Sequence, residues 1–279
     1  MKTYLDCYLC LLRQALTAVR RAGLSDDDQL AVINGVLGSL QELEPGQTPP
    51  ILATQIHHVI RDKTGIADPY LDLKQRSTQK ALALYPRLKE IVAHAKDPFV
   101  TAVRLAIAGN IMDFGPADEF DLWASVQRVL AQPLAIDHVA GLRQAIERSK
   151  EVLFLSDNAG ETVFDRLLIE QIAKPVRYAV KSSPILNDAT REDAIAAGVD
   201  QVADIVEIGC DVLGTLLDRC SEEFAEIFRT ASVVIAKGMG HYESLSTAGP
   251  RVFFLLQAKC DPVADDLGVP VRSLVAKQG

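Results

Sequence analysis

The sequence predicts an α/β fold, in which an all-helical region is followed by a three-layer domain with a mostly parallel, Rossmann-like sheet. Three observations predict this fold. After residue 149, short apolar runs of strand length alternate with segments of helical spacing. These runs lack regular polar alternation, as expected of strands that are covered on both faces. Before residue 151, the spacing of apolar residues is helical throughout.

The first half is a succession of helical patterns separated by glycine, proline and Asp-Pro breaks. A chain of 279 residues is near the upper size of a single core. We therefore predict two domains, a helical cap over residues 1–150 and an α/β domain over residues 151–279, with no strand before residue 151. The expected helices cover residues 4–21, 25–43, 51–63, 70–95, 98–112, 119–131 and 137–149.

The second half contains five apolar runs of β composition. In parallel sheets, ligands bind beyond the carboxyl ends of the strands, so the residues that follow each run are the ones to inspect. The expected strands cover residues 152–155, 176–180, 202–206, 233–236 and 252–256.

Composition narrows the class of partner. A net charge of −8 argues against nucleic acid or an anionic membrane as the main partner. No apolar run approaches the roughly 20 residues needed to cross a bilayer. The first residues do not read as a signal peptide.

Five cysteines, an odd number, do not indicate a disulfide framework, so we expect a cytoplasmic protein. The sequence does not indicate an oligomeric state.

Asp157 and Asn158 directly follow the first predicted strand. Carboxylate and amide oxygens suit a hard divalent cation such as Mg²⁺ or Mn²⁺. Gly160 and Glu161 then lead into a helix, whose free N–H groups suit a phosphate. Alternatively, the Asp-Asn pair only caps that helix.

Two further strand ends would bring polar residues to the same edge of the sheet. Asp188 follows the second predicted strand, and Lys237 and Gly238 follow the fourth. With Asp157 and Asn158, Asp188 completes a set of protein ligands sufficient for Mg²⁺ or Mn²⁺. Lys237 would neutralise a phosphoryl oxygen, and Gly238 would let backbone N–H groups approach it. Alternatively, Asp188 starts the next helix and Lys237 is a solvated lysine.

These residues belong to several ordered motifs spread over most of the chain. The motifs are Cys7 and Cys10, Asp68-Pro-Tyr70, Gly109-Asn-Ile-Met-Asp-Phe-Gly115, Asp157-Asn-Ala-Gly-Glu161, Pro184-Ile-Leu-Asn-Asp188 with Thr190, Lys237-Gly238 with Tyr242-Glu243, and Lys259-Cys260. Together they resemble the damage-control phosphatases, a family that shares its metal-binding domain with a protein described as an acidic-residue methyltransferase. The Cys-x-x-Cys pair resembles that of the small prokaryotic branch.

The resemblance implies specific roles. It implies that Asp157, Asn158 and Asp188 are the metal ligands and that Lys237 contacts the substrate phosphate. The metal would be Mg²⁺ or Mn²⁺, with Ni²⁺ or Co²⁺ as further candidates. The family often has a Gln-Gly-Asn-like run after the lysine, whereas this chain reads Gly238-Met-Gly-His241. We expect this departure to affect substrate preference more than metal binding.

The cysteines have several interpretations. Cys7 and Cys10 lie three residues apart on a predicted helix, so both thiols face the same way. A tetrahedral zinc site needs four ligands, and Cys260 is a candidate third ligand in a second metal site. The alternatives are packing in an apolar core and redox chemistry. Cys210 and Cys220 are expected to be buried and inert.

Asn110 and Asp113 are candidates from the helical half. Gly109 and Asn110 interrupt a good helical pattern, and small residues allow another backbone to approach closely. We hypothesise that Asn110 and Asp113 face a cleft at the sheet edge and contact substrate. The alternative is a simple helix-terminal turn. His241 lies beside the predicted phosphate site and is a further candidate for substrate binding.

These sites predict a metal-dependent phosphoric monoester hydrolase. The expected substrate is a small phosphorylated metabolite, a sugar phosphate or nucleotide-like compound. The bound cation would polarise phosphorus and activate water, while Lys237 and helix amides stabilise the transferring group. Two alternatives stay open. One is a non-catalytic module that binds phosphate or carboxylate through a metal. The other is an S-adenosylmethionine-dependent carboxyl methyltransferase, for which the first turn carries only one glycine.

Overall fold

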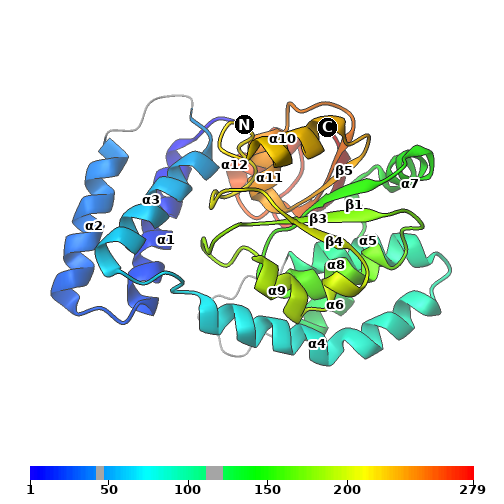
Figure 1. The fold of residues 1–279 in the computed structure, drawn as a ribbon, viewed down its shortest axis with the longest axis horizontal. Coiled ribbons are helices and arrows are strands. Elements are labelled where there is room, and N and C mark those ends of the chain that lie inside the picture. The colour runs from blue at the N-terminus through cyan, green and yellow to red at the C-terminus, as the bar shows by residue number, and fades with distance from the viewer. Residues whose placement is uncertain (42–46, 111–121) are drawn as a thin grey trace.

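The computed structural model describes residues 1–41, 47–110 and 122–279, and Asp113 lies outside these ranges. A central sheet has helices on both faces, and helices α1 to α3 stand together at one end of it (Figure 1). The predicted α/β class with a mostly parallel sheet is confirmed.

The helices of the first half match the predicted ranges within a few residues, and their ends have local causes. Helix α5 begins after Asp97, whose side chain accepts a hydrogen bond from the Val100 N–H at 3.1 Å. Helix α3 ends at Gly65, which adopts a left-handed conformation with φ of 67°. The helices are α1 (Leu5–Arg21), α2 (Asp26–Gln41), α3 (Pro49–Thr64), α4 (Leu71–Ala93), α5 (Pro98–Gly109), α6 (Leu122–Ala131) and α7 (Val139–Arg148).

The second half alternates strands with shorter helices, as predicted. Its helices are α8 (Thr162–Ile169), α9 (Arg191–Ala196), α10 (Glu222–Thr230), α11 (Gly238–Leu245) and α12 (Asp261–Leu267), with single 3-10 turns η1 (Ala159–Glu161) and η2 (Val199–Gln201). The strands are β1 (Leu134–Asp137), β2 (Val152–Leu155), β3 (Val176–Val180), β4 (Asp204–Glu207), β5 (Val234–Lys237), β6 (Val252–Gln257) and β7 (Leu274–Gln278).

The sheet has seven strands in the order β1-β7-β6-β5-β2-β3-β4. All neighbouring pairs are parallel except β6 and β7. The expectation that no strand precedes residue 151 is wrong, because β1 pairs with β7. Strand β1 has only four residues and lies at the sheet edge, where half-buried and exposed side chains alternate. Such a short edge strand carries little of the apolar signal that marks a central strand.

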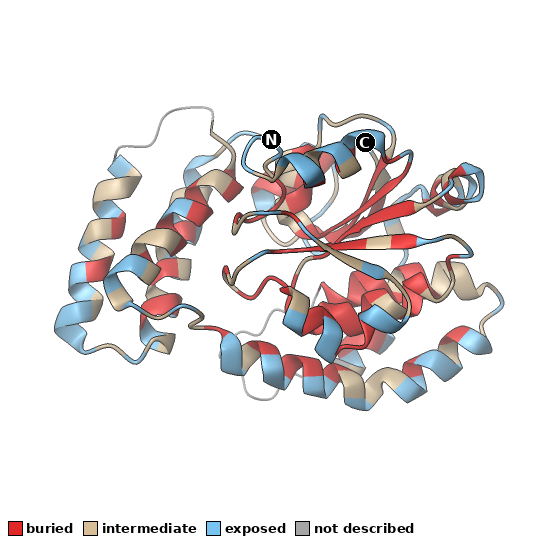
Figure 2. Ribbon diagram, in the orientation of Figure 1, coloured by how far each residue is buried: buried red, intermediate tan, exposed pale blue. Residues whose placement is uncertain are grey.

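Successive residues of the central strands pack on opposite faces of the sheet. In β2, Phe154 packs with α4 to α8 on one face, whereas Leu153 and Leu155 pack with α10 to α12 on the other. All four residues of β2 and all six of β6 are buried. Figure 2 shows this buried sheet between helices whose outer faces are exposed. This double cover explains why the strand sequences lack polar alternation.

Helices α1 to α3 have an apolar core of their own, which includes Ala15, Val36 and Ile56. Two residues of the sheet loops join it, Ile185 after β3 and Leu213 after β4. The three helices are thereby docked against the carboxyl edge of the sheet. The division into domains at residue 150 stays a prediction.

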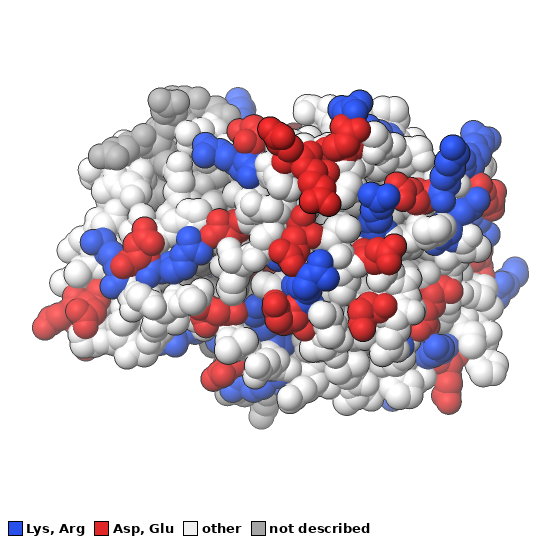
Figure 3. Space-filling view, viewed as in Figure 1, with Lys and Arg blue, Asp and Glu red and all other residues white. Residues whose placement is uncertain are grey.

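No helix in the described parts of the chain is both long and apolar enough to span a membrane. On the face drawn in Figure 3, acidic and basic side chains are interspersed. The expected absence of nucleic-acid and membrane partners stays a prediction.

Candidate active site

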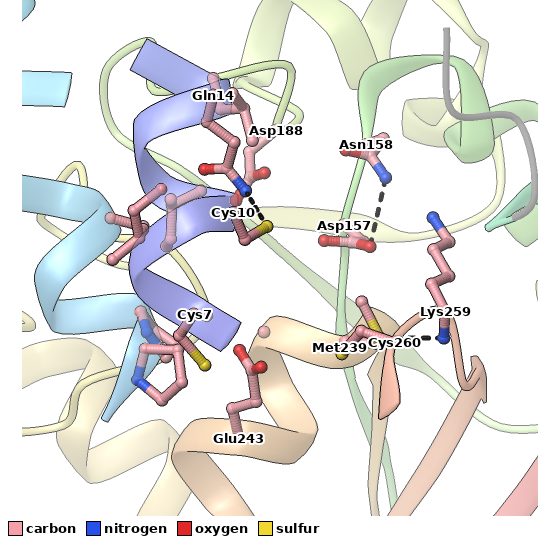
Figure 4. Close-up of a pocket in the computed structure, with 18 of the residues that line it drawn as sticks. Cys7, Cys10, Gln14, Asp157, Asn158, Asp188, Met239, Glu243, Lys259 and Cys260 are labelled. Atoms are coloured by element: carbon pink, nitrogen blue, oxygen red, sulfur yellow. Dashed lines mark hydrogen bonds between the residues drawn. The ribbon is translucent and has the colours of Figure 1, made fainter. Parts of the chain in front are cut away.

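A cavity of about 350 Å³ lies between helices α1 and α3 and the loops that follow the carboxyl ends of the strands (Figure 4). Its wall includes three predicted metal ligands, Asn110, a lysine and three cysteines. The side chains used below are Asp6, Cys7, Cys10, Asn110, Asp157, Asn158, Asp188, Leu213, Met239, Glu243, Lys259 and Cys260.

The cavity lies where the strand order reverses. From β2 the chain proceeds to β3 and β4 on one side, and it returns to β5 on the other side of β2. Ligands in open parallel sheets bind at such a point. Asp157 follows β2 and Gly238 follows β5, and they are in close contact. Gly238 has φ of +76°, and a Cβ atom there would overlap the Asp157 carboxylate. Glycine is therefore required at 238 by both conformation and space.

Backbone pairing brings Asp157, Asn158 and Asp188 together. Asn158 and Asp188 form an isolated antiparallel bridge between the loops after β2 and β3. The Ala159 N–H donates to the Asn187 carbonyl at 2.9 Å, and the Ala189 N–H donates to the Asp157 carbonyl at 2.8 Å. The three predicted ligands thus share one cavity wall on a rigid backbone.

Two amide side chains orient the carboxylates. The Asn110 amide donates to Asp157 Oδ2 at 2.7 Å and to Glu161 Oε1 at 3.0 Å. The Asn158 amide donates to the same two oxygens, at 3.2 Å and 2.5 Å. Because the Asn158 nitrogen is used in this way, its carbonyl oxygen is turned away from the two acids. The expected close approach of another backbone occurs at Gly109, where a Cβ would lie 3.4 Å from Glu161 Cα, and Asn110 lines the cavity. A contact of Asn110 with substrate stays a prediction.

The acids at the cavity are poorly compensated. Burial, followed by the charges of Glu161 and Asp188, raises the pKa of Asp157 well above its usual value. Burial also raises the pKa of Asp188 to about 6, although Lys181 lies 3.5 Å away and opposes the shift. The site therefore concentrates negative charge that a bound cation would offset.

The donor set fits a hard divalent cation. Two carboxylates and an amide oxygen are the ligands that Mg²⁺ and Mn²⁺ favour, with water completing the shell. In the described ranges no group of three or more His, Cys, Asp and Glu side chains could hold a metal ion by itself. The predicted site does not require three such side chains, because the proposed third ligand is the amide oxygen of Asn158.

Lys237 does not line this cavity. Its side chain is fully buried, and its ammonium donates to Glu161 Oε2 at 2.9 Å and Asp165 Oδ1 at 2.7 Å. Burial alone would lower the pKa of Lys237, but these two acids outweigh it and raise that pKa. Sequence reasoning missed Asp165, whose carboxylate also accepts the Tyr178 hydroxyl at 2.7 Å. The ammonium of Lys237 is thus held by two carboxylates, and its contact with a substrate phosphate stays a prediction.

Three other predicted residues lie behind the wall. Gly160 and Glu161 are buried in η1. The Glu161 carboxylate accepts hydrogen bonds from Lys237, Asn110 and Asn158. His241 is buried, with Nδ1 2.6 Å from the Lys237 carbonyl oxygen. Burial lowers the pKa of His241 to about 3, so its ring is neutral at neutral pH. A substrate-binding role for these three stays a prediction.

Among the described residues that line the cavity, Lys259 is the one lysine or arginine. It follows β6, and its charge lowers the pKa of Asp157 against the larger effects of burial. Figure 4 shows its side chain on the same side of the cavity as Asp157 and Asn158. Its position at the sheet edge could have been predicted from the sequence, because Lys259 follows a predicted strand as Lys237 does.

The three cysteines Cys7, Cys10 and Cys260 line the same cavity, together with Glu243 (Figure 4). Burial raises the pKa of each thiol, which disfavours the thiolate that a metal requires. The absence of a metal-holding group in the described chain gives the predicted second metal site no support.

Comparison with known proteins connects this site to a family. The family model described as damage-control phosphatase ARMT1-like domain matches residues 3–275. A damage-control phosphatase of Archaeoglobus fulgidus is 36% identical and covers 97% of both chains. One of Pyrococcus horikoshii is 35% identical, over 99% of this chain and 97% of the relative. The crystal structure of a DUF89 family protein from Pyrococcus horikoshii superposes with a TM-score of 0.91 at 34% identity, covering 100% of this chain and 99% of that one. This chain therefore belongs to the damage-control phosphatase ARMT1-like domain family.

Proposed function

We propose that this protein is a metal-dependent phosphatase that hydrolyses phosphate monoesters of small metabolites, in metabolite damage control. One observation carries the proposal: Asp157, Asn158 and Asp188 converge on one cavity whose wall also carries Lys259. The family and the names of the relatives from Archaeoglobus fulgidus and Pyrococcus horikoshii support the phosphatase class.

Asp157, Asn158 and Asp188 would hold the cation, which we propose is Mg²⁺ or Mn²⁺, with Ni²⁺ or Co²⁺ as further candidates. When bound, such a cation supplies Lewis-acid polarisation of a phosphoryl oxygen and a more acidic water. Asn110 would keep the Asp157 carboxylate in position through its 2.7 Å hydrogen bond. Lys259 would neutralise charge on the phosphoryl group.

Lys237 has an indirect role in this proposal. Its ammonium fixes Glu161 and Asp165, and Glu161 in turn accepts hydrogen bonds from Asn110 and Asn158. Lys237 would therefore position the amides that orient the metal ligands. The direct contact of Lys237 with phosphate that the resemblance implies stays a prediction.

The size of the cavity bears on the substrate. A volume of about 350 Å³ is at the lower end of small-molecule sites. It favours a compact sugar phosphate or nucleotide-like compound over a macromolecular phosphoester. The described lining also includes the apolar side chains of Leu213 and Met239.

The test is hydrolysis of a panel of sugar phosphates and nucleotides by the metal-depleted protein, alone and with each cation. We expect phosphate release only with metal, lost again on chelation and restored by Mn²⁺ or Mg²⁺. Full activity after extended dialysis against EDTA would overturn the proposal. Saturable binding of metal and phosphate ester without turnover would instead identify a binding module.

A further inference from the structure

Cys210 and Cys220 stand at the two ends of the loop that joins β4 to α10. Their sulfurs lie 3.7 Å apart, and both residues are half-buried, not sealed in the core. The base of the loop is already closed, because the Ser221 N–H donates to the Ile208 carbonyl at 3.0 Å. The expectation that these cysteines are buried is therefore wrong, because both are half-buried; the expectation that they are inert stays untested. Their ten-residue separation gave no sign of the closure.

The two thiols differ in acidity. The hydrogen bond between the two sulfurs lowers the pKa of Cys210 to about 7, although burial opposes the shift, and Lys181 adds to it. The same hydrogen bond, with burial, raises the pKa of Cys220. The thiol with the lowered pKa thus lies 3.7 Å from a hydrogen-bonded partner thiol. This is the arrangement of an attacked cysteine and a resolving cysteine.

The loop between them contacts the cavity and the helices that cover it. Leu213 lines the cavity, and its N–H donates to Thr54 Oγ1 of α3 at 3.0 Å. Asp211 accepts from Arg61 of α3 at 2.6 Å. A covalent closure of this loop would therefore fix the wall that joins the sheet to α3.

We propose that Cys210 and Cys220 are a site of reversible oxidation, at which a hydroperoxide converts the dithiol to a disulfide. The Cys210 thiolate attacks the peroxide O–O bond, forming a sulfenic acid and releasing an alkoxide or hydroxide that takes a proton from water. The Cys220 thiol then attacks the Cys210 sulfur, and water leaves as the S–S bond forms. The two sulfurs together lose two electrons, which reduce the O–O bond.

The geometry requires only a local movement. An S–S bond is about 2.05 Å long, so the sulfurs must approach by roughly 1.7 Å. Rotation about the side-chain bonds can supply this, because the loop base is already closed by hydrogen bonds. The disulfide would restrict residues 210–220 in the unfolded chain, which stabilises the folded state.

The experiment treats the reduced full-length protein with hydrogen peroxide and maps disulfides by mass spectrometry of its peptides. We expect a Cys210–Cys220 link that dithiothreitol removes, and a higher unfolding temperature for the linked form. In Cys220→Ser, dimedone should trap a sulfenic acid at Cys210. The matched control, a Cys7→Ser/Cys10→Ser/Cys260→Ser variant, should still form the link.

Peptides that show no bond at these positions, or bonds among the cavity cysteines only, would overturn the proposal. An unfolding temperature that falls on oxidation would overturn the stabilising closure. If Cys220→Ser does not fold, mapping of the native chain still decides. None of these measurements depends on phosphatase activity, so this proposal and the proposed function can fail separately.

Discussion

Two groups of acidic residues lie on either side of the sheet-loop wall: an inner group of Glu161 and Asp165, and an outer group of Asp157 and Asp188. They differ in the cations that surround them. On the inner side, Glu161 and Asp165 hold the ammonium of Lys237, and all three side chains are sealed from solvent. On the cavity side, Asp157 and Asp188 have raised pKa values in spite of Lys181 and Lys259. Both inner acids accept hydrogen bonds from Lys237, although burial raises the pKa of Asp165 to about 6, as it does that of Asp188. In the outer group, Lys181 lies 3.5 Å from Asp188, and Asp157 accepts hydrogen bonds from amide groups.

This difference indicates that the inner and the outer acidic residues have different roles. A buried ion pair with short hydrogen bonds costs several kcal/mol to break, but it has no capacity left for a ligand. Carboxylates at a cavity wall are within reach of an external cation, which would favour their ionised form. We infer that the inner group is a support and the outer group is the binding site. The predictions that follow test this division, beginning with the largest effect.

Asp157→Asn removes the charge of the outer group while preserving its shape. We expect metal-dependent hydrolysis to fall by at least about 1,000-fold, because a metal supplies several kcal/mol of charge stabilisation. Global stability should hold or rise, since a buried repulsive charge is removed. Steady-state kinetics with Mn²⁺ and urea unfolding measure both. Asp218→Asn, at a side chain that is 80% exposed, is the matched control. Near-native turnover by Asp157→Asn would exclude Asp157 as a required ligand.

Lys237→Met should act mainly on stability. It leaves Glu161 and Asp165 buried without their cation, and breaking a buried pair in this way costs about 3–5 kcal/mol. Urea unfolding measures this loss, and Lys89→Met, at a lysine whose side chain is 57% exposed, is the control. If stability hardly changes while turnover per bound metal falls, the direct role of Lys237 on phosphate is restored.

Sequence reasoning located the strands and their carboxyl ends because buried parallel strands leave a strong apolar signal. Strands β2 and β3 were predicted with their observed bounds. It also selected Asp157, Asn158 and Asp188, since topology alone brings adjacent strand ends together. Strand β1 was not predicted, because it is an edge strand of four residues whose side chains are alternately half-buried and exposed.

The contacts between side chains were not predictable in the same way. Lys237 and Lys259 both follow strands, and only packing decides which one turns inward to Glu161 and Asp165. Asp165 lies on a helical stripe, where nothing in the sequence marks it as the partner of a lysine 72 residues away. The docking of α1 over the site likewise depends on tertiary packing, so Asp6 was not anticipated.

Lys259→Met tests whether the lysine at the cavity wall acts on catalysis or on stability. By analogy with the loss of one electrostatic donor, turnover should fall by about 2–4 kcal/mol in transition-state stabilisation. The stability cost should be about 1 kcal/mol or less, because the side chain is only half-buried. Paired kinetics and urea unfolding separate the two effects, with the exposed Lys150→Met as control. A large loss of stability with unchanged kcat/KM would place Lys259 with the supporting group.

Glu243 gives the smallest expected effect and a distinct pH signature. Burial raises its pKa from 4.5 to about 7, against the lowering effect of the chain's N-terminus. The unfolded chain then binds fewer protons than the folded one between these values, so this contribution to stability falls as pH rises from about 4.5 to about 7. Glu243→Gln removes the ionisable group and should flatten that part of the stability profile.

At pH 8 the gain from Glu243→Gln should be about 1 kcal/mol, below the full linkage value because the side chain is partly open to the cavity. Urea unfolding at pH 5 and pH 8 measures it, and the exposed Glu223→Gln should leave the profile unchanged. A gain that is equal at both pH values would show that Glu243 acts through packing instead of charge. A loss at pH 8 would mean that the attraction between the N-terminal ammonium and the ionised carboxylate outweighs the cost of burying that carboxylate.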